Sequence, residues 1–306
     1  MASPIEQNLV VGEQLPTSFT IRNISFLLLI SATFVWFWQT LEFVLTLSIQ
    51  GGRFGHYSHI VLIPFLSIYL LYLGRKEIFS NVESSPWLGS FVTGVGVVLV
   101  WNTSTAPVDP LDGLSHTMLS MVVLCWGAFL LHFGAKAFRK AYFGLLFMLF
   151  MVPLPSLLLD NIIGFLQGAT AEGVDFMFGA LRIPVFRQNE VFALSNLTIQ
   201  IAEECSGIRS SIALFISSLV AGHLFLGSTW TKLVLVTVVI PLTIIKNIFR
   251  IVVLSLLANY IDPSFLTDSI LHHSGGIPLF FVAGAVLLGI LWLLRRCEKS
   301  PRQTVF

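Results

Sequence analysis

Apolar runs, most of them about twenty residues long, recur along the chain with short polar segments between them. A helix of about twenty apolar residues spans the hydrocarbon core of a bilayer and closes its own backbone hydrogen bonds. Hydrophobic residues make up 55% of the 306 residues and charged residues only 11%, well below the roughly 25% charged residues of soluble domains. We therefore expect an all-α polytopic membrane protein in which residues 1–306 form a single integral membrane domain. The expected transmembrane helices, about eight, are 24–48, 59–74, 88–106, 117–134, 141–159, 210–227, 233–259 and 277–294.

Basic residues in the short loops predict an orientation, because Lys and Arg concentrate on the cytoplasmic side of membrane proteins. The loop 107–113 holds Asp109 and Asp112 and neither Lys nor Arg, so we place it outside the cytoplasm. Both termini are then cytoplasmic. The basic residues that fall on the cytoplasmic side are Arg22, Arg75, Lys76, Lys136, Arg139, Lys140, Lys232, Arg295, Arg296, Lys299 and Arg302.

Residues 160–205 do not fit the pattern of simple spans. Residues 160–181 have a helical composition but carry three carboxylates and four glycines, which favours an interfacial or partly re-entrant segment. Apolar and polar residues alternate over 197–201, as in a half-buried strand. We expect a small extracytoplasmic β-hairpin, with strands 190–194 and 197–201, as an insert before the sixth span.

A thiol follows this insert, in the segment Glu204-Cys205-Ser206-Gly207-Ile208-Arg209. The start of a helix favours negative charge, and therefore the thiolate, through its dipole and its unbonded N–H groups. Cys205 is either a nucleophile or a small packing residue at a helix end. Cys125 falls within an apolar span and Cys297 in the cytoplasmic tail, so neither receives a catalytic role. The spacing of these cysteines predicts no metal site and no cofactor.

The predicted topology brings further polar residues to the same outer boundary. Lys246, Asn247 and Arg250 are three and four residues apart in the seventh span, so they share a helix face. His272 and His273 stand at the entrance of the last span. A charge inside a membrane is expensive and generally marks a functional site. The structural alternative for Arg250 is an ion pair with Glu203, Glu204 or Asp268.

These residue types suit nucleophilic acyl transfer. A thiolate attacks a peptide carbonyl and forms a thioester, which splits one difficult step into two. A nearby imidazole takes the thiol proton and later protonates the leaving amine. A guanidinium stays protonated, so it stabilises the thiolate or the oxyanion and does not act as a base.

Several segments together resemble the exosortase/archaeosortase family of membrane transpeptidases. The last span is preceded by a further element of that family, a His ahead of a Gly. His272 with Gly276 keeps this spacing better than His273, although Ile277 stands where the family usually has an aromatic residue. The other matching segments are His56-Tyr57-Ser58-His59, Pro153-Leu154-Pro155, Ile183-Pro184-Val185, the segment 202–210 around the Cys, and Asn247-Ile248-Phe249-Arg250.

The resemblance implies that Cys205, Arg250 and His272 are catalytic. It also implies a bacterial inner-membrane enzyme whose substrates are exported proteins with a C-terminal sorting signal. Such a signal combines a short Pro-containing motif, a hydrophobic helix and a basic cytoplasmic end. The cleaved protein would pass through a thioester to an acceptor or to water. Residues with expected supporting or substrate-binding roles are Glu204, Arg209, Lys246, Asn247, His273, Tyr57 and His59.

Some of these roles have structural alternatives. Tyr57 and His59 either help to recognise the motif or anchor the second span at the interface. Arg209 tunes the thiolate, binds a lipid phosphate, or pairs with Glu204. The expected partners are sorting-signal proteins and membrane lipids. Net charge near zero and the lack of a basic patch argue against nucleic acid.

Two rival functions stay open. One is a transporter whose Arg250 and Lys246 bind an anionic solute, although no duplicated, interrupted spans are visible. The other is a non-catalytic factor in the export of surface polysaccharide. The sequence predicts no oligomeric state.

Overall fold

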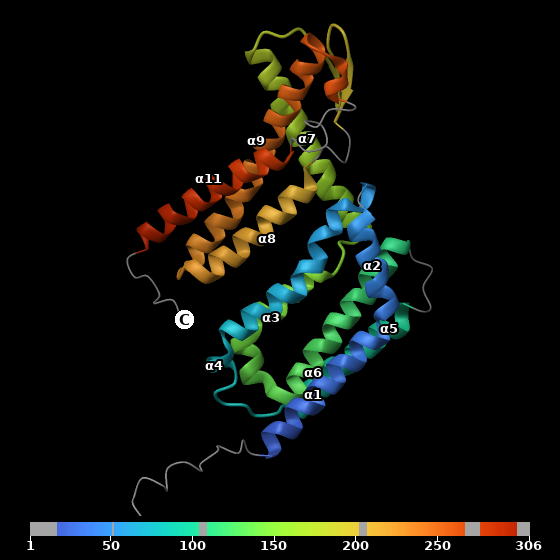
Figure 1. Ribbon diagram of the computed structural model, residues 1–306, viewed down its shortest axis with the longest axis vertical. Coiled ribbons are helices and arrows are strands. Elements are labelled where there is room, and N and C mark those ends of the chain that lie inside the picture. The colour runs from blue at the N-terminus through green and yellow to red at the C-terminus, as the bar shows by residue number, and fades with distance from the viewer. Residues whose placement is uncertain (1–16, 51, 104–108, 202–206, 267–275, 299–306) are drawn as a thin grey trace, which may run out of the picture. The chain divides into compact units, whose positions relative to one another are not determined.

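A computed structural model describes residues 17–50, 52–103, 109–201, 207–266 and 276–298 (Figure 1). The chain divides into two compact units. The first comprises Met1–Leu45 and Leu62–Pro153, and the second comprises Thr46–Val61 and Leu154–Phe306. Each unit has its own buried apolar core.

The first unit is built around the long helix α6 (Pro110–Phe147), which contacts five other helices of the unit, namely α1, α3, α4, α5 and η3. Phe129, Phe133 and Leu145 of α6 form its buried core together with Ile78, and Phe26 packs its ring against Phe133 with centroids 4.9 Å apart. The other helices are α1 (Thr17–Trp36), α2 (Trp38–Gln50, whose last five residues fall in the second unit), α3 (Ile63–Leu73), α4 (Arg75–Ile78), α5 (Pro86–Thr103) and η3 (Met148–Met151).

α6 breaks at Gly134, which has φ 78° and ψ 176°. This left-handed φ favours glycine, and a Cβ at this position would lie 1.7 Å from the backbone oxygen of Glu83. The predicted span 117–134 ends at this break. The predicted span 141–159 is not one helix, because α6 ends at Phe147 and a non-helical stretch after Met151 separates it from α7 (Ser156–Ala180).

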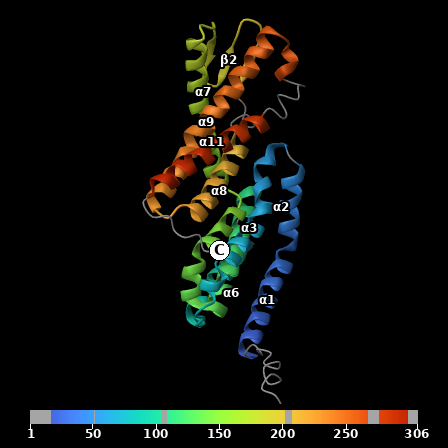
Figure 2. The ribbon, with the colours of Figure 1, turned by 60° about the vertical axis from the view of Figure 1, so that its left-hand side comes forward.

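In the second unit, α9 (Thr229–Tyr260) packs against α7, α8, α11 and η5. Figure 2 shows β2 beside α7, and Phe192 of this strand forms a buried core with Phe178 of α7 and Val252 of α9. The unit contains η2 (Gly52–Leu62) except for its last residue. The remaining elements are α7 (Ser156–Ala180), β1 (Phe186–Gln188), β2 (Val191–Ala193), β3 (Thr198–Gln200), α8 (Ile208–Phe225), η5 (Pro263–Leu266) and α11 (Gly276–Cys297).

The predicted β-hairpin is confirmed. β2 pairs antiparallel with β3, and Leu194 N donates to Leu197 O across the turn at 2.8 Å. Ile199 is 7% exposed and Ile201 2% exposed, as the alternation predicted. A third strand, β1, pairs antiparallel with β2. The pattern missed β1 because Phe186-Arg187-Gln188 is too short to show an alternation.

The carboxylate of Glu298 accepts hydrogen bonds from the turn between α8 and α9. Glu298, just beyond α11, accepts hydrogen bonds from Gly227 N and Ser228 N, both at 2.9 Å, and from the Thr231 hydroxyl. Burial disfavours the charged form, but these hydrogen bonds prevail and lower the pKa of Glu298 below its ordinary value. The negative charge also suits the start of α9. The turn is thereby tied to the end of α11.

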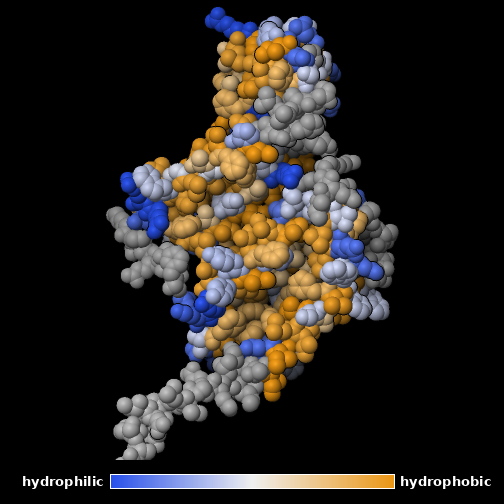
Figure 3. Space-filling view, in the orientation of Figure 1, coloured by the Kyte–Doolittle hydropathy of each residue, from blue (hydrophilic) through white to orange (hydrophobic). Residues whose placement is uncertain are grey.

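Four helices of the described chain are long and apolar enough to cross a membrane. Hydrophobic side chains dominate the surface visible in Figure 3, as expected of helices that face lipid. The protein is therefore a multi-pass membrane protein, but the predicted count of eight spans is not confirmed. The four helices are Leu111–Met151, Ile208–Phe225, Thr229–Tyr260 and Ile277–Cys297.

The difference in count comes from the N-terminal half of the chain. The predicted span 24–48 is a pair of helices bent by 64° between Trp36 and Trp38, and it is a fifth candidate if the pair is one span. The predicted spans 59–74 and 88–106 form shorter apolar helices, Tyr57–Leu73 and Pro86–Asn102. Residues 160–181 were predicted to be interfacial or partly re-entrant, and all but the last of them belong to the continuous helix α7 (Ser156–Ala180), which is not among the candidate spans.

Candidate functional site

The start of α8 is defined by Gly207, which has φ 75° and ψ 11°. Its carbonyl accepts hydrogen bonds from the hydroxyls of Ser210 and Ser211, each at 2.9 Å. A Cβ on Gly207 would lie 3.3 Å from Asn247 Oδ1 of α9. A glycine at this position therefore permits both the left-handed turn and the close approach of Asn247. The helix begins within two residues of its predicted start.

α9 contributes two buried polar residues to the start of α8. Lys246 is 8% exposed and Asn247 1% exposed. The ammonium of Lys246 donates a hydrogen bond to Ser210 Oγ. Arg250, one turn later on α9, is half-buried. The predicted polar face of α9 is thus partly confirmed, since Lys246 and Asn247 both reach the first turn of α8.

Arg209 lies in that same first turn but is exposed. Its three predicted roles therefore stay open. Glu204, Cys205, His272 and His273 lie outside the described residues. The predicted meeting of Cys205, Arg250 and His272 stays a prediction.

The segment that enters the thiol motif is fixed by Ile201. Its carbonyl accepts a hydrogen bond from Gln167 Nε2 of α7 at 3.0 Å, and its N–H donates to Glu190 O at 3.0 Å. Gln167 is 8% exposed. Sequence reasoning missed Gln167, and its polar side chain within an apolar stretch of α7 is the signal that could have found it. Residues 202–206 are therefore joined to fixed positions at both ends, Ile201 and Gly207.

The sheet, whose last strand directly precedes Ile201, is anchored to α7 by Arg187 of β1. The guanidinium donates to Glu172 Oε1 at 2.8 Å and to Asp175 Oδ2 at 3.4 Å, and it lies 5.6 Å from the ring centroid of Phe192. The hydrogen bond from Arg187, and then its charge, lower the pKa of Glu172. Two of the carboxylates that suggested an interfacial segment therefore bind the sheet.

Asn259 of α9 holds the turn between β2 and β3. Asn259 Oδ1 accepts a hydrogen bond from Asn196 N at 3.2 Å, and Asn259 O accepts one from Asn196 Nδ2 at 3.2 Å. These hydrogen bonds connect the hairpin turn directly to α9, the helix that carries Lys246 and Arg250.

Replacing Gln167 with leucine is expected to lower the free energy of unfolding by about 1–3 kcal/mol, because the buried carbonyl of Ile201 loses its donor. Thermal unfolding of the purified chain in detergent measures the change. Asn161→Leu is the matched control, since Asn161 is an exposed amide on the same helix and donates to Leu157 O, one turn earlier. Equal losses in the two variants would contradict a special role for Gln167.

Tyr57 and His59 lie in η2. Tyr57 is 3% exposed, and its backbone carbonyl accepts a hydrogen bond from Ser48 Oγ at 3.2 Å. His59 is half-buried. For both residues, recognition of the motif and anchoring of the second span stay predictions.

Among the described residues, no group of three His, Cys, Asp or Glu side chains is arranged to hold a metal ion. Cys205, His272 and His273 fall outside that part of the chain, so this finding does not bear on them.

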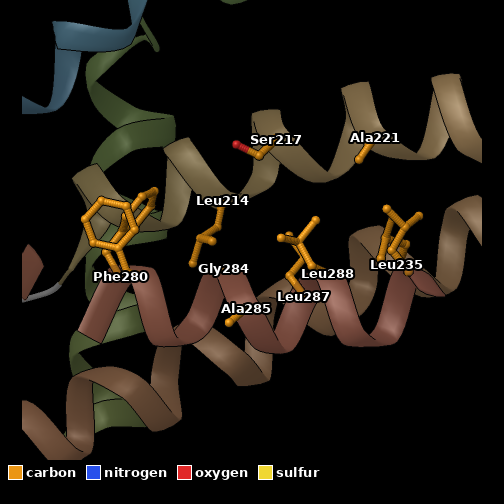
Figure 4. A pocket seen from close by; sticks show the side chains of 11 residues that line it. Leu214, Ser217, Ala221, Leu235, Phe280, Gly284, Ala285, Leu287 and Leu288 are labelled. Atoms are coloured by element: carbon orange, nitrogen blue, oxygen red, sulfur yellow. The ribbon is translucent and has the colours of Figure 1, made fainter. Parts of the chain in front are cut away.

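An apolar groove of about 340 Å³ opens between α8 and α11 (Figure 4). Leu214 and Ser217 of α8 face Phe280, Gly284 and Leu288 of α11 across it. A Cβ on Gly284 would meet nothing within 4 Å. The groove lies within two candidate membrane spans and is lined almost entirely by hydrocarbon.

Comparison with known families gives one match. The model of the transmembrane exosortase family matches residues 53–289, which is most of the chain and includes the thiol motif and the polar residues of α9. No curated protein and no solved structure matches the chain.

Proposed function

Because the chain belongs to the transmembrane exosortase family, we propose that it is a cysteine transpeptidase that cleaves C-terminal sorting signals from exported proteins. The family match over residues 53–289 is the observation that carries this proposal. The first turn of α8, which begins three residues after Cys205, supports it, because the buried polar side chains of Lys246 and Asn247 meet there.

In the proposed reaction, the Cys205 thiolate attacks the carbonyl carbon of the scissile peptide bond. The oxyanion that forms is stabilised by Arg250, whose guanidinium stays protonated. His272 takes the thiol proton and gives it to the leaving amine as the carbon–nitrogen bond breaks. An acceptor nucleophile or water then attacks the thioester, and the Cys205 thiol is regenerated.

The proposed site faces away from the cytoplasm at the bacterial inner membrane, with both chain termini inside. A substrate whose hydrophobic helix lies in the same bilayer presents the bond next to that helix at a fixed depth. Confinement and orientation of this kind replace much of the entropy cost of bringing two reactants together. The proposed recognition of the Pro-containing motif by Tyr57 and His59 belongs to this outer boundary.

Capture of the acyl-enzyme tests the proposal. The full chain is produced with a tagged exported protein that ends in a Pro-motif, a hydrophobic helix and a basic tail, and the product is analysed by intact mass and peptide mapping. We expect a substrate-derived mass on Cys205 and none in the Cys205→Ala variant. His272→Ala and His273→Ala in parallel separate the two imidazoles, and only the first is expected to stop cleavage.

Cleavage that continues in Cys205→Ala would overturn the nucleophile assignment. A chain that never processes such substrates, in any variant, would favour the transporter or the export factor.

A further inference from the structure

Basic residues gather where three helices of the first unit end or begin. α3 ends at Leu73, α5 begins at Pro86 and α6 breaks at Gly134. Two of these places are in contact, because the Ser85 hydroxyl accepts a hydrogen bond from Ala135 N at 3.2 Å. Five exposed basic residues lie in the segments 75–83 and 135–140 at this end of the unit. This basic cluster consists of Arg75, Lys76, Lys136, Arg139 and Lys140.

The segment that contains α4 lies beside the basic face of α6. Lys136, Arg139 and Lys140 are three and four residues apart, so they share one face of the helix. The Lys140 ammonium donates hydrogen bonds to Glu77 O at 2.9 Å and to Ser80 Oγ at 3.0 Å. These contacts bring the basic residues of α4 next to those of α6.

The positive charge of this cluster is only partly balanced. Glu77 and Glu83 are the acidic residues of the two segments, which leaves a net charge of +3. Glu83 pairs with Lys136 at 2.8 Å. Within the described part of the chain, the side chains of Lys76 and Arg139 make neither an ion pair nor a hydrogen bond. Two cations of the cluster are therefore available to a ligand.

Exposed aromatic residues mark the depth of the cluster in the membrane. Tyr72 precedes α4, Trp87 lies at the start of α5, and Tyr142 follows Lys140 by two residues, and all three side chains are exposed. The Arg75 guanidinium lies 3.8 Å from the ring centroid of Tyr72. Tyr and Trp concentrate at the headgroup level of bilayers. We therefore place the basic cluster among the lipid headgroups.

The helices that leave the cluster present apolar side chains on their surface. Phe65 and Ile68 of α3, Phe91 of α5 and Leu146 of α6 are exposed. Figure 3 shows hydrophilic side chains beside a hydrophobic surface at the place where Figure 1 labels α4. A ligand that combines a negative charge with hydrocarbon chains fits both surfaces, whereas a soluble anion would use the charges alone.

We propose that the basic cluster binds the headgroup of an anionic phospholipid, with Lys76 and Arg139 on its phosphate and its acyl chains along α3 and α6. The guanidinium of Arg139 can bind two phosphate oxygens at once, and the ammonium of Lys76 adds a point charge. A zwitterionic phospholipid binds less tightly, because its own ammonium offsets its phosphate. The inference does not depend on the proposed function.

Native mass spectrometry of the full chain in detergent tests the inference. Phosphatidylglycerol and phosphatidylcholine with the same acyl chains are titrated separately, and the Kd of the first bound lipid is measured. We expect phosphatidylglycerol to bind at least about tenfold more tightly. Each basic residue near an anionic lipid contributes about fivefold. The double variant Lys76→Gln/Arg139→Gln should therefore weaken phosphatidylglycerol binding by about 25-fold and leave phosphatidylcholine binding within about twofold.

Three controls complete the experiment. Lys76→Arg/Arg139→Lys keeps both charges and should stay within about threefold of the parent Kd. Arg295→Gln/Arg296→Gln removes two exposed cations from the end of α11, and should leave the Kd within about twofold. Glycerol 1-phosphate carries the headgroup charge without acyl chains, so an equal concentration should not displace the lipid. Because Lys76 and Arg139 are exposed, the glutamine variant should unfold at the parent temperature.

Equal Kd values for the two lipids would overturn the inference, as would an unchanged Kd for phosphatidylglycerol in Lys76→Gln/Arg139→Gln. An equal loss in Arg295→Gln/Arg296→Gln would also overturn it, since the effect would then be one of total charge. Displacement of the lipid by glycerol 1-phosphate would assign the cluster to a soluble phosphate instead. Sorting-signal cleavage is not measured in any of these experiments, so the proposed function stands or fails separately.

Discussion

Replacing Arg250 with alanine should slow sorting-signal cleavage by about 10²–10³-fold, which is the usual cost of removing one donor to a developing oxyanion. Arg250 follows Lys246 and Asn247 by one turn on α9, and both of those residues reach the start of α8. Arg250→Lys keeps the charge but loses the planar, forked donor, so it should restore activity only in part. Cleavage of the tagged substrate over time measures the rates.

The control for this prediction is Arg295→Ala. Arg295 is an exposed arginine at the end of α11, and its loss is expected to leave the cleavage rate within twofold. Equal rates for the Arg250→Ala variant and the parent chain would remove Arg250 from the reaction. A lower yield of folded Arg250→Ala protein, with an unchanged rate per folded molecule, would assign it a structural role instead.

Gly134→Ala should destabilise the first unit by about 3 kcal/mol or more. A left-handed φ costs an L-residue roughly 1–2 kcal/mol. The new Cβ would also lie 1.7 Å from the backbone oxygen of Glu83, so the chain on one side must move, and such overpacking costs typically 1–3 kcal/mol. Thermal unfolding in detergent and the yield of monodisperse protein measure the loss.

Gly94→Ala is the matched substitution for this prediction. Gly94 lies in α5 of the same unit, and a Cβ there would meet nothing within 4 Å. Alanine is the better helix former by about 0.5–1 kcal/mol, so this variant should be at least as stable as the parent. A Gly134→Ala protein as stable as the Gly94→Ala protein would show that the break in α6 does not require glycine.

Much of the second unit could be predicted from the sequence. The expected spans 210–227, 233–259 and 277–294 coincide with α8, α9 and α11 to within a few residues, because polar or glycine-containing segments bound each apolar run. The hairpin was visible because Leu197, Ile199 and Ile201 alternate with polar residues. These signals are local, so one sequence suffices to detect them.

The count of eight spans is not confirmed, because the length of an apolar run does not say where a helix bends or ends. The helix pair α1 and α2 bends by 64° within an apolar stretch that shows no proline or glycine at the bend. The predicted spans 59–74 and 88–106 form helices that are apolar but shorter than the candidate spans. The bend has no local signature in the sequence.

Part of the candidate site could likewise be predicted from local sequence signals, and part could not. Helical spacing predicted that Lys246, Asn247 and Arg250 share a face. It could not predict that Lys246 would meet Ser210, or that Asn247 would pack on Gly207, because both contacts depend on how two helices lie against each other. Gln167 was missed for the same reason, since its partner Ile201 follows β3, 34 residues away in the sequence.

The contact between Ser210 and Lys246 fixes the lengths of two helix segments, or arms, that run from this contact to the turn between α8 and α9. From Ser210 to the end of α8 is about 22 Å, and from the start of α9 to Lys246 is about 26 Å, at 1.5 Å per residue. Deleting one residue from either arm would shift the side chains beyond it by about 1.5 Å and rotate them by about 100°. Homologous chains should therefore differ in sequence along these arms but keep their lengths, and insertions should gather elsewhere.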